Sequence, residues 1–174
     1  MRHNNLYLLV FVALLGGCAG YAPQPPAPAA SAPESGILRG SAAPERAEAL
    51  LQALTALGTS YRYGGDSYAT GFDCSGLVVH VFLEAYGIRL PHNAYEQSEM
   101  GTPVSLAELR PGDLVFYDTE HRPYSHVGIY LGNGKFIHAP KTGAQVRVES
   151  MSRPYWVRRF DGARRIALPQ TAGR

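Results

Sequence analysis

The sequence has few cysteines, no long apolar segment and no concentration of charge of one sign. Its 174 residues carry 16 Lys and Arg against 14 Asp and Glu, which gives a formal net charge of +2. No run of Lys and Arg is present that would follow a phosphate backbone, so we exclude a nucleic-acid partner. No internal repeat is present either, and we expect a short leader followed by one folded domain.

The longest apolar stretch lies near the N-terminus, from Leu6 to Leu15. It follows Arg2 and is too short to cross a bilayer, which is typical of the apolar region of a signal peptide. The next residues, Leu15-Gly16-Gly17-Cys18, resemble a lipobox, in which the cysteine is acylated. Ala19 lacks the Asp that commonly retains Gram-negative lipoproteins in the inner membrane, so this resemblance implies an outer-membrane lipoprotein facing the periplasm. The alternative is an ordinary signal peptide with a coincidental cysteine.

The composition divides the chain into four expected segments. These are a signal peptide (1–17), a lipidated Cys18 with a tether (18–44), a folded domain (45–168) and a short tail (169–174). The tether is rich in Ala and Pro and has too few apolar side chains to fold. We therefore expect it to hold the domain away from the membrane.

The domain begins with helical periodicity and ends with short β-rich segments. Apolar positions recur at helical spacing from Glu45 to Leu57, and again after Cys74 until Gly87. The Gly-rich segment Tyr61–Phe72 is predicted to be a loop. Strands are expected at Leu114–Tyr117, Val127–Leu131, Lys135–Ala139, Val146–Val148 and Trp156–Ile166. This order indicates an α+β fold, with helices packed on a mostly antiparallel sheet.

Cys74 is the cysteine that remains once Cys18 is assigned to lipid, so it has no disulfide partner. The second predicted helix begins at or beside Cys74, where free backbone N–H groups and the helix dipole favour a thiolate. The same N–H groups can stabilise an oxyanion. Ser75 and Gly76 are small and leave the thiol approachable. We predict a nucleophile, the alternative being a cysteine buried for packing.

Two histidines lie in neighbouring predicted strands. His126 begins one strand and His138 lies in the next, beyond the turn Gly132-Asn133-Gly134. A three-residue turn would pair Gly128 with His138 and place both histidines on one face, whereas a two-residue turn would separate them. This arrangement suits a base for Cys74 with a polar partner that fixes its tautomer.

Other roles for the histidines are less consistent with the pattern. A zinc site formed by Cys74, His126 and His138 has a spacing that matches no common structural site, so we expect no metal. The remaining histidines are assigned structural roles; they are His3, His80, His92 and His121.

Three blocks of the sequence resemble the signature blocks of the NlpC family of cell-wall cysteine peptidases. They are Asp73-Cys74-Ser75-Gly76-Leu77, Ser125-His126-Val127-Gly128-Ile129-Tyr130 and Phe136-Ile137-His138-Ala139. The resemblance implies a compact papain-like fold. It also implies that Cys74 is the nucleophile, that His126 is the general base and acid, and that His138 orients His126.

The same resemblance implies substrate contacts around the nucleophile. Tyr63 would line the active site and donate its hydroxyl to the oxyanion or the substrate. Asp73 and Ser75 would contact a substrate amine, although Asp73 is equally suited to cap the helix. His92 departs from the family pattern, because many relatives carry Arg after the Leu-Pro pair, and the effect of that difference is left open.

The layout resembles that of Spr-like murein endopeptidase lipoproteins, which implies hydrolysis of an amide in the peptidoglycan stem peptide. We expect the D-Ala to meso-diaminopimelate crosslink to be cut, with the γ-D-Glu to diaminopimelate bond or the N-acetylmuramoyl-L-alanine amide as alternatives. A thiol-dependent acyltransferase and a non-enzymatic scaffold are the rivals from other classes. The expected partners are stem peptides and, through the Cys18 lipid, the membrane. We expect no cofactor and a monomer.

Overall fold

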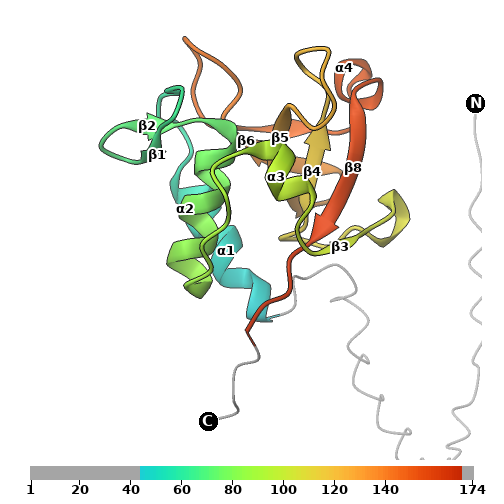
Figure 1. The fold of residues 1–174 in the computed structure, drawn as a ribbon, viewed down its shortest axis with the longest axis horizontal. Coiled ribbons are helices and arrows are strands. Elements are labelled where there is room, and N and C mark those ends of the chain that lie inside the picture. Colours follow the sequence, from blue (N-terminus) through green and yellow to red (C-terminus); the bar gives the residue numbers. More distant parts are fainter. Residues whose placement is uncertain (1–43, 170–174) are drawn as a thin grey trace, which may run out of the picture. The chain divides into compact units, whose positions relative to one another are not determined.

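Helices precede a six-stranded antiparallel sheet in the computed structural model, which describes residues 44–169 (Figure 1). The α+β prediction is confirmed. The predicted signal peptide, Cys18, nearly all of the tether and residues 170–174 lie outside the described residues. No helix within 44–169 is long and apolar enough to cross a membrane. The helices are α1 (Pro44–Thr55), α2 (Cys74–Tyr86), α3 (Ala94–Ser98) and α4 (Pro154–Val157), with a 3₁₀ turn η2 (Leu106–Glu108).

The main sheet has the strand order β3-β8-β4-β5-β6-β7, and all its neighbouring strands are antiparallel. A separate two-stranded ribbon lies in the segment predicted to be a loop. The strands are β1 (Asp66–Ser67), β2 (Gly71–Phe72), β3 (Thr102–Pro103), β4 (Leu114–Tyr117), β5 (His126–Gly132), β6 (Lys135–His138), β7 (Arg147–Ser150) and β8 (Phe160–Arg165).

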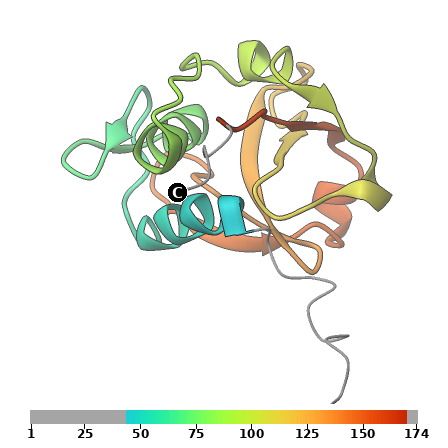
Figure 2. The same cartoon turned by 90° about the horizontal axis from the view of Figure 1, so that it is seen from below.

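Helices α1 and α2 lie side by side against one face of the sheet (Figures 1 and 2). The small side chains Ala49 and Ala53 are fully buried in α1 and allow α2 to approach closely, while Phe82 of α2 is fully buried in the core. Leu54, which belongs to the apolar pattern of α1, is 41% exposed. The inward face of α1 is therefore made of alanines, because the neighbouring helix leaves no room for larger side chains.

The other face of the sheet is covered by α4. Side chains alternate between the two faces of a strand, so Val115 and Tyr117 of β4 point away from α1 and α2 and pack with Trp156. The prediction of a strand at Trp156–Val157 is wrong, since these residues form α4. Pro154 occupies the start of this helix, where the missing N–H of proline costs nothing, and the strand begins only at Phe160.

The hairpin of β5 and β6 has the predicted register but a different turn. Ile129 pairs with Ile137, and Gly132 rather than Leu131 pairs with Lys135. The turn therefore has two residues, and a bulge at Leu131 absorbs the extra residue. The expectation that a two-residue turn would separate the histidines is wrong, because it did not include a bulge.

Asp113 connects the end of β8 to the start of β4. Its carboxylate is fully buried and accepts hydrogen bonds from Nε and an Nη of Arg165, at 2.8 and 2.7 Å, and from the Arg110 N–H at 2.7 Å. The two guanidinium bonds form a bidentate pair, which is the strongest geometry for such contacts. The Asp113 carboxylate, which lies in the turn before β4, is therefore hydrogen-bonded although it is buried.

We predict that Asp113→Asn destabilises the protein by about 3 kcal/mol, because it leaves the Arg165 guanidinium without a charged partner. Urea unfolding followed by circular dichroism measures the loss. The matched control is Glu120→Gln, which breaks the exposed ion pair with Arg122 and should cost less than about 1 kcal/mol. Equal free energies of unfolding for the two variants would show that the buried pair contributes no more to stability than the exposed one.

Candidate functional site

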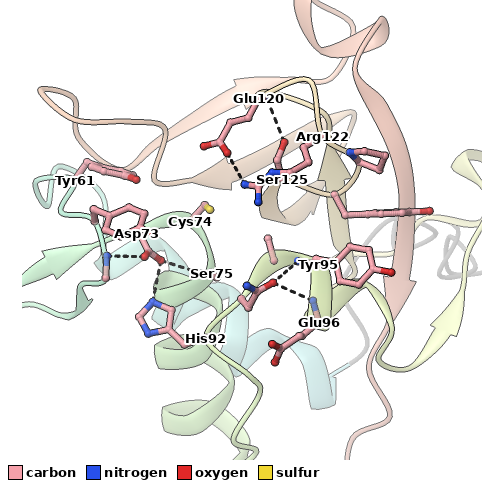
Figure 3. A pocket seen from close by; sticks show the side chains of 16 residues that line it. Tyr61, Asp73, Cys74, Ser75, His92, Tyr95, Glu96, Glu120, Arg122 and Ser125 are labelled. Carbon is pink, nitrogen blue, oxygen red and sulfur yellow. Dashed lines mark hydrogen bonds and ion pairs between the residues drawn. The ribbon is translucent and has the colours of Figure 1, made fainter.

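Cys74 is the first residue of α2 and lines a cleft of about 710 Å³. The cleft walls come from residues 61–64, the start of α2, residues 92–96 and the loop 120–125 (Figure 3). The thiol is partly buried, and the backbone N–H groups of Val127, Ser75 and Cys74 itself are close enough to favour its charged form. The nucleophile predicted from the sequence therefore lies where the N-terminus of α2 meets β5, the strand that begins with His126.

Asp73 caps α2 and organises the entrance to the helix (Figure 3). Its Oδ1 accepts hydrogen bonds from the Gly76 N–H at 2.7 Å and the Ser75 hydroxyl at 3.0 Å, and it lies 3.0 Å from Nε2 of His92. Its Oδ2 accepts the Gly64 N–H at 2.8 Å. The capping role expected for Asp73 is confirmed. His92, to which we assigned a structural role, lies in the cleft and contacts this carboxylate.

Gly76 has a stricter role than the sequence indicated. A Cβ at this position would lie 2.1 Å from the carbonyl oxygen of Gly65 and 2.8 Å from Nε2 of His92. Such distances are not tolerated, so any side chain at position 76 would displace the loop that crosses the start of α2. The glycine therefore permits the backbone of residue 65 to pass close to the helix, and the accessibility of the thiol is a secondary effect.

The thiol of Cys74 is not the thiolate that its position at a helix N-terminus indicated. Burial, followed by the neighbouring charge of Asp73, raises the pKa of Cys74 to about 11. Hydrogen bonds from the three backbone N–H groups lower this pKa but do not outweigh the other two effects. The prediction included the helix dipole but neither the burial of the thiol nor the carboxylate that caps the helix, and the resting side chain is a neutral thiol.

His126 and His138 face each other across β5 and β6. Nε2 of His126 lies 2.7 Å from Nδ1 of His138, and the two rings are perpendicular. Burial lowers the pKa of His126 to about 4, although the charge of Asp73 opposes this shift. Burial also lowers the pKa of His138, with help from the charges of His126 and Arg147. Both imidazoles are therefore neutral near pH 7. The hydrogen bond between them fixes the orientation of the His126 ring.

Trp156 and Glu149 support this pair, and the sequence analysis missed both. The indole of Trp156 stacks on His126 at 5.8 Å between ring centroids and lies edge-on to His138 at 5.1 Å. Its Nε1 donates to Glu149 at 3.0 Å. Pro154 is a sequence signal for the start of a helix and could have predicted α4. The position of Trp156 against the histidines could not be predicted, because it depends on packing between α4 and the sheet.

Two tyrosines of the Gly-rich segment, Tyr61 and Tyr63, line the cleft with Cys74. Tyr63 is 87% exposed, whereas Tyr61 packs against the core together with Cys74. Burial and then the charge of Cys74 raise the pKa of Tyr61 to about 12. The tyrosines are two positions apart in one Gly-rich segment, and no local pattern in the sequence distinguishes them.

No three Cys, His, Asp or Glu side chains between residues 44 and 169 are grouped so that they would hold a metal ion. His126 and His138 instead contact each other and Trp156 in a buried setting, and Cys74 begins the helix that packs on β5. This geometry matches a thiol, a base and a residue that orients the base.

Comparisons with known proteins agree with this arrangement. The profile of the NlpC/P60 family matches residues 58–165. The chain is 46% identical over 118 residues to the murein DD-endopeptidase MepH of Escherichia coli K12, covering 66% of this chain and 44% of that protein. It is 48% identical over 109 residues to the murein DD-endopeptidase and LD-carboxypeptidase MepS of the same strain, covering 63% and 56%. The chain thus spans about half the length of these curated relatives.

Solved structures give the same result. The NlpC/P60 domain of the peptidoglycan hydrolase SagA superposes with a TM-score of 0.61 at 34% identity, covering 70% of this chain and 98% of that domain. A lipoprotein-like NLP/P60 protein from Staphylococcus aureus Mu50 gives a TM-score of 0.65 at 32% identity, covering 75% and 44%. Fold, site geometry and sequence agree, and the chain belongs to the NlpC/P60 family.

Proposed function

We propose that the protein is a lipid-anchored peptidoglycan endopeptidase in which Cys74 attacks an amide of the stem peptide. The observation that carries the proposal is the 2.7 Å contact between His126 and His138 beside a thiol at the start of α2. The murein DD-endopeptidases MepH and MepS, to which the chain is similar, support peptidoglycan as the substrate and the cell envelope as the location. They also support the D-Ala to meso-diaminopimelate crosslink as the bond cut.

The neutral state of the site defines the order of proton transfers. For Nδ1 of His126 to accept a proton, its Nε2 must carry the hydrogen and donate it to Nδ1 of His138. His126 then takes the thiol proton as the sulfur attacks the carbonyl carbon, and the N–H groups at the start of α2 stabilise the oxyanion. His126 next delivers the proton to the nitrogen as the C–N bond breaks. A water molecule hydrolyses the thioester, and the proton it loses to His126 returns to the sulfur.

The residues around Cys74 have assigned positions in this reaction. Tyr63, expected from the sequence to donate its hydroxyl toward the oxyanion, lines the cleft, and Tyr61 is a second candidate because the charge of Cys74 acts on its hydroxyl. Asp73 and Ser75 face the cleft around Cys74, which we call the first cleft. The Asp73 carboxylate favours a positively charged amine of the substrate there. His138 acts through His126, so it is a positioning residue.

We predict that Cys74→Ala and His126→Ala each reduce peptide release from purified sacculi by roughly 10³-fold or more, because each removes one member of a unit that acts together. His138→Ala should cause a smaller loss, since water can partly replace an orienting group. The matched control is His121→Asn, an exposed histidine that does not itself line the cleft around Cys74 and should retain full activity. Sacculi hydrolysis by a folded Cys74→Ala protein would refute the assignment of the nucleophile.

Mass spectrometry of the released ends identifies the bond in the same digest. Collapse of crosslinked dimers to monomers with intact tetrapeptides is the expected result. Monomers shortened to L-Ala-γ-D-Glu would instead assign the enzyme to hydrolysis of the γ-D-Glu to diaminopimelate bond. Release of unsubstituted glycan would indicate an amidase, and transfer of an acyl group to another acceptor would indicate an acyltransferase.

The pKa values of the site predict the acid limb of the pH profile. His126 must be neutral to act as a base, so kcat/KM on a soluble crosslinked dimer should stay high below pH 6.5 and fall as the pH approaches about 4. Because the unfolded chain binds the proton more readily, stability also falls as the pH drops from 6.5 toward about 4. Circular dichroism at each pH separates the two effects. An acid limb centred at 6.5 or above in folded protein would contradict the neutral pair.

The lipid anchor gives a separate prediction. Cys18→Ser should abolish labelling with palmitate and fractionation with the outer membrane, while the purified protein keeps full activity on sacculi. The matched control is Cys74→Ser, which should keep both the label and the membrane location while losing activity. Acylation of the Cys18→Ser protein would exclude Cys18 as the attachment point.

A further inference from the structure

A second cleft, of about 480 Å³, adjoins the site on the side of His126. Cys74 lines the first cleft and His126 lines the second, while Glu120 belongs to the walls of both. The two clefts therefore adjoin at Glu120, with the proposed nucleophile in the wall of one and the proposed base in the wall of the other. A peptide bound across the site has one half in each cleft.

The two clefts differ in the sign of their charge. The first carries the carboxylates of Asp73, Glu96 and Glu120 against one guanidinium, Arg122, which pairs with Glu120 at 2.6 Å. In the second cleft three cations outnumber two carboxylates; the cations are Lys141, Arg147 and Arg153. The first cleft thus favours a positively charged group, and the second favours a negatively charged one.

Glu149 holds the two arginines of the second cleft in place. Its Oε1 accepts from Arg147 at 2.7 Å and its Oε2 accepts from Arg153 at 2.6 Å. Burial raises the pKa of this carboxyl, but the hydrogen bonds from Trp156 and both arginines outweigh burial and hold the pKa below its usual value. The carboxylate is only 6% exposed, whereas the arginine side chains are 49% and 65% exposed. Their outer N–H groups therefore remain available to a ligand.

Lys141 adds a cation that the rest of the fold does not neutralise. Within the part of the chain that the structure describes, its ammonium pairs with no carboxylate. It lines the second cleft next to Pro140, just after β6. With the arginines already committed to Glu149, this side chain supplies the unpaired positive charge of the cleft.

The direction in which a substrate lies follows from proton transfer. The base that takes the thiol proton must later deliver it to the nitrogen that leaves, so that nitrogen lies on the side of His126. The second cleft, which His126 lines, therefore holds the amine half of the substrate. The acyl half lies in the first cleft beside Cys74 and Asp73.

We propose that the second cleft binds a free carboxylate on the carbon that carries the leaving nitrogen, with Lys141 and the outer face of Arg153 as its partners. The inference rests on the proposed endopeptidase function and narrows its specificity. In the D-Ala to diaminopimelate crosslink, the D-centre of diaminopimelate carries both the scissile nitrogen and a free carboxylate. In a γ-D-Glu to diaminopimelate bond of a tetrapeptide stem, the corresponding carboxyl is already joined to D-Ala and has no charge. The second cleft thereby selects the crosslink.

The single tryptophan of the sequence provides a direct probe of this cleft, because Trp156 is part of its wall. The experiment titrates the Cys74→Ala protein with a tetrapeptide muropeptide monomer, which is the amine-side product of crosslink cleavage. A second titration uses the same monomer with the D-centre carboxylate amidated. We expect a saturable change in Trp156 emission, with about tenfold weaker binding of the amidated monomer, as for the loss of one charge-assisted contact.

Variants of Lys141 in the Cys74→Ala background test the partner. Lys141→Gln should weaken binding of the free-carboxylate monomer about tenfold and leave binding of the amidated monomer unchanged, while Lys141→Arg should retain most of the affinity. Arg158→Gln is the matched control, because it removes one exposed positive charge outside the cleft and should change neither affinity. Equal binding of the two monomers, or an equal loss for both in Lys141→Gln, would overturn the proposal.

This binding readout needs no turnover, so it is independent of the sacculi digest. If crosslinks are cut but the carboxylate has no effect on binding, the inference about the second cleft fails and the proposed function stands. If no bond in sacculi is cut, but Lys141→Gln still weakens binding of only the free-carboxylate monomer, the proposed function fails and the binding site stands.

Discussion

The Asp73 carboxylate is the interaction on which the arrangement of the site depends. One side chain connects the loop at Gly64, the first turn of α2 and His92 on the way to α3. These three segments form one side of the cleft around Cys74. The cap therefore does more than begin a helix, because it holds the walls of the first cleft at fixed distances from the thiol. Its charge also adds to burial in raising the pKa of the neighbouring Cys74 thiol.

The opposite side of the site is organised by apolar packing around two neutral imidazoles. Gly128 makes this packing possible, since a Cβ there would lie 2.7 Å from Cδ2 of Phe136 and 3.2 Å from Cβ of His138. Close approach of β5 and β6 lets His126 and His138 form a hydrogen bond, and Trp156 excludes water from one face of the pair. A hydrogen bond between imidazoles in such a dry setting is stronger than in water, but the same dryness keeps both rings uncharged.

The main elements of the fold and the three proposed catalytic side chains followed from local patterns. Helical spacing located the start of α2 at Cys74, and strand alternation placed His126 and His138 on one face. The features that escaped prediction depend on contacts between distant segments. Trp156 reaches the histidines only because α4 covers the second face of the sheet, and Tyr61 is distinguished from Tyr63 only by the core beneath it. The pKa of Cys74 was misjudged because the dipole of α2 was considered without the burial of the thiol and without the charge of Asp73.

The neutral thiol has a consequence for chemical durability. With a pKa of about 11, only about one Cys74 side chain in 10⁴ is a thiolate at pH 7. Peroxides and disulfides react with thiolates, so the resting side chain is slow to form sulfenic acid or mixed disulfides. Cys18 is the sole other cysteine in the sequence. Burial and the Asp73 carboxylate, which make the sulfur a weaker resting nucleophile, thus also protect it from oxidation.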